Sequence, residues 1–333
     1  MNAPLPTASP FADLLPGQAR LMPWGAAEYH SDEHCASNSQ LLMLRRQGAP
    51  TFADRYIHRT MPDKPSKDMR VGTLLHTCVL EPDKWRARLA PPRPYLSPAP
   101  ERPAIADGKA KKGSPEKIAF LKWKADDDAW RTECADLIAD WEGRCPAKAI
   151  TMTADEETRV AGMKAGLEAH DFARSRLWEW PDAVSEQSIM WRHPSGALIR
   201  VLVDRLVPYE TESGQAAWYV ADLKTALDHR WPSWRKSIRK FGYHWQAAIY
   251  TDAVQALHPK DKVTFVHVVV RNTFPHRAAC YEVGPAVLAT GRRQYESALR
   301  ELVLRRESND WRDDCDGDCQ VIDEMPELEY DDR

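Results

Sequence analysis

The stretch from residue 186 to residue 250 constrains the fold of this chain most strongly. It holds three segments rich in β-branched and aromatic residues, 186–191, 198–204 and 218–225, and a turn at 193–196 joins the first two. Such segments, bounded by turn residues, predict neighbouring strands. A basic and aromatic segment follows, with apolar residues at helical spacing. The stretch therefore predicts a small sheet followed by a packed helix.

Carboxylates and a lysine stand on two of these predicted strands. Asp222 and Lys224 are two residues apart, so they point to the same face of one strand, and Asp204 ends the strand before it. Converging carboxylates suit Mg²⁺, and a nearby lysine can orient or deprotonate a water or stabilise charge on a phosphate. Glu186 can add a further carboxylate. Ordinary strand-edge charge is the alternative, but the apolar flanks indicate buried strands, where an unpaired carboxylate is costly.

The helix predicted from Pro232 to about Leu257 carries two further polar candidates. Gln246 and Tyr250 are four residues apart and share a face. An apolar stripe on this helix is most simply core, and four basic residues lie off it: Arg235, Lys236, Arg239 and Lys240. Alone they form a solvated face, but after the Asp-x-Lys strand they are well placed to hold phosphates.

The rest of the chain predicts an α/β domain with a helical N-terminal part. Helices are expected at 37–47 and 70–89, with a break or restart at Pro82. His76 lies on the second of these, four residues after Gly72. A lone histidine on a helix is more often structural. If His76 is a metal ligand, its imidazole suits Mn²⁺ better than Mg²⁺. Further elements are expected as helices at 115–141, 153–178 and 285–306 and strands at 262–271 and 277–283.

Composition shifts mark the expected boundaries. Residues 1–20 are rich in Pro and Ala and predict a disordered segment, and residues 21–306 predict a single domain. Within that domain, residues 91–117 form a Pro-rich, then basic loop, which is either a DNA-facing flap or a plain surface insertion. Residues 307–333 carry 12 acidic and 2 basic side chains, net −10, which leaves net +7 on residues 1–306 of a chain whose total is −3. A basic body with an acidic tail fits nucleic-acid binding, or a tail that only aids solubility.

The seven cysteines show no regular spacing, which favours a reducing, cytoplasmic environment over a disulfide framework. Cys315 and Cys319 lack the spacing of a zinc knuckle. The longest apolar run, near 263–270, is too short to span a bilayer, so no membrane partner is expected.

Several motifs together resemble the RecB-like branch of the PD-(D/E)XK nucleases, and within it the RecE-type exonucleases, represented by the C-terminal domain of exodeoxyribonuclease VIII and related phage proteins. The resemblance runs from about residue 24 to 305. It rests on four motifs in order: Gly72-Thr-Leu-Leu-His76, Asp204, Asp222-Leu-Lys224, and Gln246-Ala-Ala-Ile-Tyr250. Relatives often have Pro before the first Asp, where this chain has Val203.

That resemblance implies a Mg²⁺-dependent exonuclease, with Mn²⁺ as an alternative metal, that digests one strand of duplex DNA 5′→3′ and leaves a 3′ overhang. It also implies a ring-shaped homotetramer and a single-strand annealing protein as partner. The implied site has His76, Glu186, Asp204 and Asp222 as metal ligands, Lys224 as catalytic lysine, and Gln246 with Tyr250 on the active-site helix. Two alternatives stay open: an endonuclease on the same fold, and a DNA-binding module without catalysis.

Overall fold

The computed structural model describes residues 11, 13–25, 28–29, 35–61, 66–103 and 110–313. The chain divides into two compact units, one made of Met1–Leu80 with Thr158–Arg333 and the other of Glu81–Glu157. Most of the predicted acidic tail, including Cys315 and Cys319, lies outside the described residues. None of the helices in the described ranges is long and apolar enough to cross a membrane.

One mixed sheet organises the first unit. Its strands follow chain order, and every neighbouring pair is antiparallel except β4 and β5, which run parallel. The strands are β1 (Ala19–Met22), β2 (Val184–Arg192), β3 (Leu198–Glu210), β4 (Ala216–Ala226), β5 (Lys262–Arg271) and β6 (Ala278–Glu282). The predicted small mixed sheet flanked by helices is therefore confirmed.

Two helices connect the parallel strands, as a crossover between parallel neighbours requires. They are α8 (Trp231–Phe241) and α9 (Tyr243–Leu257). The sequence predicts one continuous helix here, which is wrong because Gly242 has φ +72° and ends α8 in a left-handed cap. Phe241, the last residue of α8, is 46% exposed.

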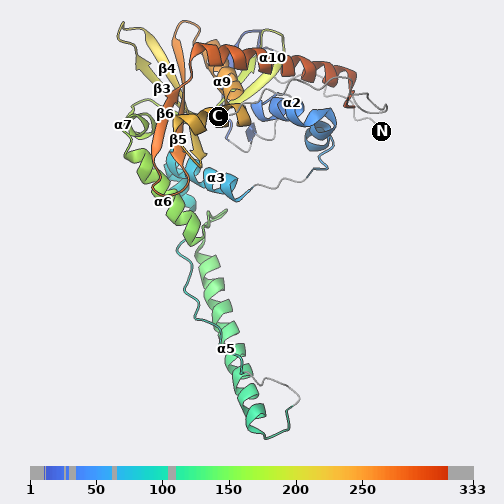
Figure 1. Ribbon diagram of the computed structural model, residues 1–333, viewed down its shortest axis with the longest axis vertical. Helices are drawn as coiled ribbons and strands as arrows, with labels where there is room; N and C mark the ends of the chain where they lie inside the picture. The colour runs from blue at the N-terminus through green and yellow to red at the C-terminus, as the bar shows by residue number, and fades with distance from the viewer. Residues whose placement is uncertain are drawn as a thin grey trace. The chain divides into compact units, whose positions relative to one another are not determined.

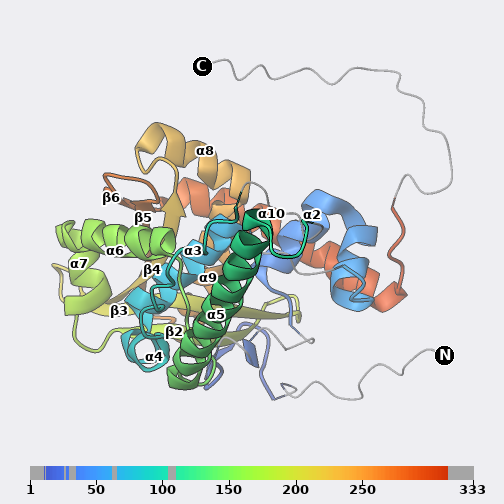
Figure 2. The same cartoon turned by 90° about the horizontal axis from the view of Figure 1, so that it is seen from below.

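Alternate residues of β4 face different layers. Val220 belongs to the main core with residues of α9, whereas Tyr219 contacts Phe172 of α7 (Asp171–Arg174) in an edge-to-face arrangement. Figure 1 shows α9 with α2 (Asn38–Phe52) and α10 (Pro285–Ser308) on one side of the sheet and α7 on the other. The helices α2 and α10 lie side by side, as Figure 2 also shows. Asp222 is two residues after Val220 on β4, so its side chain points to the same side of the sheet, the side of α9.

Capping residues, glycine and proline set the ends of the N-terminal helices. Ser37 caps α2 in a capping box with Gln40, and Gly48 kinks this helix with φ +82° before it continues to Phe52. A π-helical turn (Ala53–Ile57) extends it. The helix α3 (Lys67–Leu80) ends before Pro82, which opens α4 (Pro82–Arg88).

Two glycines seat the loop between β5 and β6 against α6 (Ala154–Glu168). A Cβ at Gly166 would collide with the carbonyl oxygen of His276, and one at Gly162 would collide with the His276 ring. Because glycine alone permits this approach, the loop rests directly on the α6 backbone. Beyond α7, the π-helical turn Ser175–Glu179 leads to β2.

The second unit pairs the Pro-rich segment with the long helix α5 (Pro115–Arg144). Three indoles of α5 donate hydrogen bonds to its carbonyl oxygens: Trp123 to Pro100, Trp130 to Ser97 and Trp141 to Pro91. The guanidinium of Arg93 also lies over the ring of Trp141. Within the predicted 91–117 loop, residues 91–103 are thus an extended strap along α5, as Figure 1 shows, and the helix begins at Pro115, inside the range predicted as loop.

The first strand departs from the sequence prediction. Residues 1–20 are expected to be disordered, yet Ala19 and Arg20 pair with Trp191 and Met190 of β2. Phe11 and Leu14 are also buried. Because β1 is only four residues long and half exposed, it lacks the apolar alternation that would mark it in the sequence.

Candidate active site

The sheet divides at the predicted carboxylates. β3 pairs with β4 from Glu210 back to Arg205, whose partner is Ala221. Past this pair the strands part: the earlier half of β3 stays with β2, and the later half of β4 stays with β5. Asp204 and Asp222 are the first residues beyond the last pair, so both stand in the fork between the two strands.

Asp222 is the centre of a buried polar cluster. Its side chain is 1% exposed, and Lys224 Nζ lies 2.6 Å from Oδ2. Gln246 of α9 donates from Nε2 to Oδ1 at 2.7 Å, and His267 Nδ1 lies 3.3 Å from Oδ2. The histidine comes from β5, where it is the direct register partner of Asp222. Strand, neighbouring strand and helix therefore all fix this carboxylate.

Neighbouring charges determine the protonation states of Asp222 and Lys224. Burial alone would raise the pKa of Asp222, but Lys224 and then His267 outweigh burial and lower this pKa to about 2. Burial likewise opposes the charge on Lys224, yet the carboxylates of Asp222 and Asp204 raise the lysine pKa. Asp222 is thus ionised and Lys224 protonated at neutral pH.

Asp204 is held differently. The backbone N–H of Leu223, left without a ladder partner by the fork, donates to Asp204 Oδ2 at 2.8 Å. His76 Nδ1 lies 3.6 Å from the same oxygen. Burial raises the pKa of Asp204, and the charge of Asp222 adds to this, while His76 opposes it. The positive charge near the Asp204 carboxylate therefore does not offset the cost of its burial.

His76 has the hydrogen-bonding arrangement of a metal ligand. Its Nε2 lies 2.8 Å from the carbonyl oxygen of Leu223, and a carbonyl only accepts, so Nε2 carries the proton in the neutral ring. The lone pair is then on Nδ1, which faces Asp204. Metal-binding histidines typically donate their second nitrogen to a backbone carbonyl in this way.

Glu186 completes a group of three. Ligand atoms of His76, Glu186 and Asp204 all lie within 4.8 Å of one another. Glu186 has φ +51° in the middle of β2, and the pairing of β2 with β3 passes from Ser185 to Gln187 without it. Such a backbone conformation costs about 1–3 kcal/mol in a non-glycine residue and concentrates at functional sites.

These residues fit a divalent cation. Opposite ligands at 2.0–2.3 Å from an octahedral ion are roughly 4.0–4.6 Å apart, and the three ligand atoms lie within 4.8 Å of one another, close to that span. One imidazole nitrogen and two carboxylates suit Mn²⁺ and are compatible with Mg²⁺. A cation would also relieve the unfavourable charge on Asp204. Asp222 is not in this group, because its oxygens are directed at Lys224, Gln246 and His267.

Tyr250 lies one helical turn beyond Gln246 on α9 and is 8% exposed. Burial raises its pKa well above the usual value, and Tyr29, Asp222 and Asp204 raise it further. The phenol therefore stays protonated beside the carboxylates. Its ring is edge-to-face with Phe265 of β5, so the residue joins the polar cluster to the core.

The four predicted DNA-contacting residues, Arg235, Lys236, Arg239 and Lys240, are all exposed on α8. The same helix buries Trp234, whose ring stacks on Tyr243 and meets His267 edge-on. The Lys224 ammonium also lies 5.5 Å from the centre of the Tyr243 ring. One face of α8 thus supports the polar cluster, and the other presents the basic residues to solvent.

His267 is a site residue that the sequence interpretation missed. It is completely buried, and burial lowers its pKa while Asp222 opposes the shift. Its signal in the sequence is a histidine inside the apolar run 263–270. A polar residue there must have a buried partner, and the strand order supplies Asp222.

Comparison with models of known protein families identifies the family of this chain. The model of a PDDEXK-like domain of unknown function (DUF3799) matches residues 37–325. The chain belongs to this PDDEXK-like family. Its fold is therefore that of the PD-(D/E)XK nuclease superfamily, as the sequence motifs predict.

A solved structure agrees with this fold. The crystal structure of a putative exonuclease from Eubacterium rectale superposes with a TM-score of 0.52 at 12% sequence identity. The match covers 92% of this chain and 96% of the other. At this identity the likeness shows the fold alone. A comparison with curated proteins finds no match.

Proposed function

We propose that this protein is a metal-dependent exonuclease that digests linear duplex DNA from its ends. The observation that carries the proposal is the pairing, in one fork of the sheet, of a His–Glu–Asp group with a buried Asp–Lys pair. The His–Glu–Asp group fits a divalent cation, and the Asp–Lys pair holds the lysine ammonium in a fixed position. Membership in a PDDEXK-like family and a structural neighbour named as a putative exonuclease support the same chemistry.

His76, Glu186 and Asp204 would hold the cation, with Asp222 adding negative charge beside them. A bound Mg²⁺ or Mn²⁺ polarises a phosphoryl oxygen and lowers the pKa of bound water. Lys224, protonated and 16% exposed, stabilises negative charge that develops on the phosphate. In the reaction a water oxygen would form a new bond to phosphorus and one ester P–O bond would break. One proton of the water would pass to the departing oxygen to give the alcohol, and the other would stay with the phosphate product.

Gln246 and Tyr250 act as positioning residues. The amide of Gln246 fixes the Asp222 carboxylate, which in turn fixes the Lys224 ammonium. Arg235, Lys236, Arg239 and Lys240 are proposed to contact the phosphate backbone from the exposed face of α8. Polarity of 5′→3′ on one strand, a 3′ overhang, a ring-shaped tetramer and a single-strand annealing partner all belong to this proposal through the RecE-type resemblance.

The test is digestion of linear duplex DNA with Mg²⁺ or Mn²⁺, comparing 5′ and 3′ end labels. Asp222→Ala and Lys224→Ala are each expected to abolish digestion, while Lys260→Ala, which removes an exposed lysine from the turn before β5, leaves it unchanged. Undiminished digestion by either of the first two variants contradicts the proposed site.

A covalently closed circular duplex separates the remaining alternatives. An exonuclease leaves the circle intact, whereas an endonuclease cuts it. If wild-type protein binds DNA but digests neither form with either metal, the protein is a binding module. Calorimetry with Mn²⁺ provides a readout independent of turnover, because Glu186→Gln and His76→Ala are expected to weaken metal binding.

A further inference from the structure

Two arginines face each other at the end of the β5–β6 hairpin. The register pairs Val270 with Ala278, and the backbone N–H of Arg271 donates to the carbonyl of Arg277, so these two residues are direct cross-strand partners. Like charges in this position destabilise a strand pair. Within the described parts of the chain, neither guanidinium forms an ion pair with a carboxylate.

The loop after β4 adds an ion pair and no net positive charge. Asp228 and Arg230 neutralise each other through paired contacts at 2.8 and 3.0 Å, and Ser233 donates to the same carboxylate. Burial lowers the pKa of His229, Asp228 opposes this, and Arg271, Arg230 and Arg277 lower it further. The Asp228 carboxylate therefore balances the charge of Arg230 and leaves those of Arg271 and Arg277 unbalanced.

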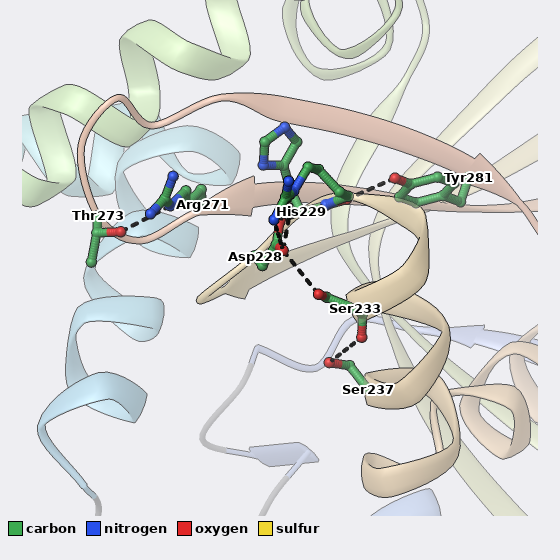
Figure 3. Close-up of polar contacts among 8 residues, drawn as sticks. Asp228, His229, Ser233, Ser237, Arg271, Thr273 and Tyr281 are labelled. Atoms are coloured by element: carbon green, nitrogen blue, oxygen red, sulfur yellow. Dashed lines mark hydrogen bonds and ion pairs between the residues drawn. The ribbon is translucent and has the colours of Figure 1, made fainter. Parts of the chain in front are cut away.

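The positions of these groups are fixed. Figure 3 shows Arg271 with its Nε directed at Thr273 Oγ1, a hydrogen bond of 3.0 Å, and Tyr281 donating to the carbonyl of His229 at 2.7 Å. The backbone N–H of Asn272 donates to Ala226 at the end of β4. Since the hairpin loop also rests on the α6 glycines, the arginines stand on rigid backbone.

Two exposed aromatic rings lie along the β5–β6 hairpin. Phe274, in the loop between Arg271 and Arg277, is 84% exposed, and Trp231, directly after Arg230, is 51% exposed. The Trp231 ring lies 5.5 Å from that of Tyr281, which is the register partner of His267 on β6 and four residues from Arg277. Positive charge with exposed aromatic rings is the composition of surfaces that bind single-stranded nucleic acid.

This cluster faces the same side of the sheet as the candidate active site. Arg271 is four residues beyond His267 on β5, so both side chains point to one face, and Ala226 is its register partner on β4. Four residues of strand span about 13 Å, which matches the rise of about four nucleotides along one strand of B-DNA.

We infer that Arg271 and Arg277, with Phe274 and Trp231, form a binding site for a single-stranded segment of DNA next to the cut. The arginines would hold backbone phosphates, and an unpaired base would stack on an exposed ring. This inference rests on the proposed function as far as the substrate is concerned. It adds a site that is separate from the basic face of α8 and from the metal group.

Binding by metal-free protein tests the inference. The full chain is titrated in EDTA into a fluorescently labelled single-stranded oligonucleotide, and anisotropy gives the affinity at several salt concentrations. Arg271→Ala with Arg277→Ala is expected to weaken binding at least about tenfold. The slope of log affinity against log salt is expected to fall in magnitude by about 1.4, because each phosphate contact on a single strand contributes about 0.7.

The matched control is Arg293→Ala with Arg300→Ala, which removes the same charge from exposed positions of α10. Its affinity and salt slope should stay close to those of the wild type. Arg271→Lys with Arg277→Lys keeps the charge and should preserve most of the slope. Phe274→Ala with Trp231→Ala should weaken binding roughly tenfold with little change in slope, since stacking involves no counterion release.

The outcomes separate this inference from the proposed function. Wild-type affinity and slope in the Arg271/Arg277 variant, or no binding of single strands by metal-free wild type, overturns the inference and leaves the nuclease proposal standing. Loss of binding in the variant, with no digestion by the wild type under any metal, supports the DNA site and contradicts the nuclease. Circular dichroism and thermal melting of each variant confirm that it is folded.

Discussion

The two carboxylates in the fork are expected to affect stability in opposite directions when no metal is present. Asp222 has its pKa lowered from 3.8 to about 2, so folding favours its ionised form. Asp204 has its pKa raised by burial and by the neighbouring charge of Asp222, so folding opposes its ionised form. Replacing each by asparagine, which keeps the shape and removes the charge, should therefore give changes of opposite sign at neutral pH.

The magnitude for Asp222→Asn follows from the pKa change. A tenfold change in proton affinity corresponds to about 1.4 kcal/mol, so the ionised carboxylate gains about 2 kcal/mol from its surroundings. Removing it also leaves the Lys224 ammonium without its closest partner, and breaking buried pairs typically costs about 3–5 kcal/mol. We expect Asp222→Asn to lower the melting temperature by several degrees, since 1 kcal/mol corresponds to roughly 2–4 °C in a domain of this size.

For Asp204→Asn we expect a higher melting temperature, because the remaining amide oxygen can still accept from the N–H of Leu223. The size of the gain depends on pH: a raised pKa destabilises the fold only where the group is ionised, so the gain should shrink as the pH falls toward the usual carboxyl value of 3.8. The assay is thermal melting in EDTA between pH 4 and pH 8, with the exposed Glu282→Gln as control. Equal shifts in the same direction for both asparagine variants would refute this account of the fork.

Three other predictions concern the residues around the site. Gln246→Glu places a second carboxylate against Asp222 and should lower both digestion and melting temperature more than Gln246→Ala, measured on the same DNA substrate and by calorimetry. Gly166→Ala forces a methyl group into the β5–β6 loop and should destabilise the protein by roughly 2 kcal/mol or more, as overpacking of a core site does. Gly143→Ala has open space around its Cβ and should stabilise α5 by about 0.5–1 kcal/mol. Urea unfolding measures both changes. Burial lowers the pKa of His267, so folding favours the neutral ring and stability should fall as the pH drops through the usual histidine value near 6.5; His267→Gln should reduce that pH dependence.

Sequence reasoning placed the strands and the convergence of side chains because both depend on short-range patterns. Lys224 Nζ lies 2.6 Å from the Asp222 carboxylate, as two-residue spacing along a strand predicts. Two capping boxes, at Ser37 and Thr153, likewise form between residues three apart in the chain. These features require knowledge only of neighbours a few residues away.

The features that sequence reasoning missed depend on distant partners. His267 becomes a site residue only when β5 takes its register beside β4, and no local pattern fixes that register. Gly242 interrupts a helix that periodicity predicts as continuous, because the residue tolerates a left-handed cap. The opposed pair Arg271 and Arg277 likewise follows from the hairpin register rather than from spacing in the chain.

The parting of β3 and β4 has a consequence for how the site can be built. One wing of the sheet, β2 with the start of β3, brings Glu186 and Asp204, and the other wing, β4 with β5, brings Asp222, Lys224 and His267. Neither wing holds a complete set, and α3 and α9 contribute to the same place. Fragments cut between β3 and β4 should therefore be inert when separate, and any activity they regain on mixing would measure the closing of the fork itself.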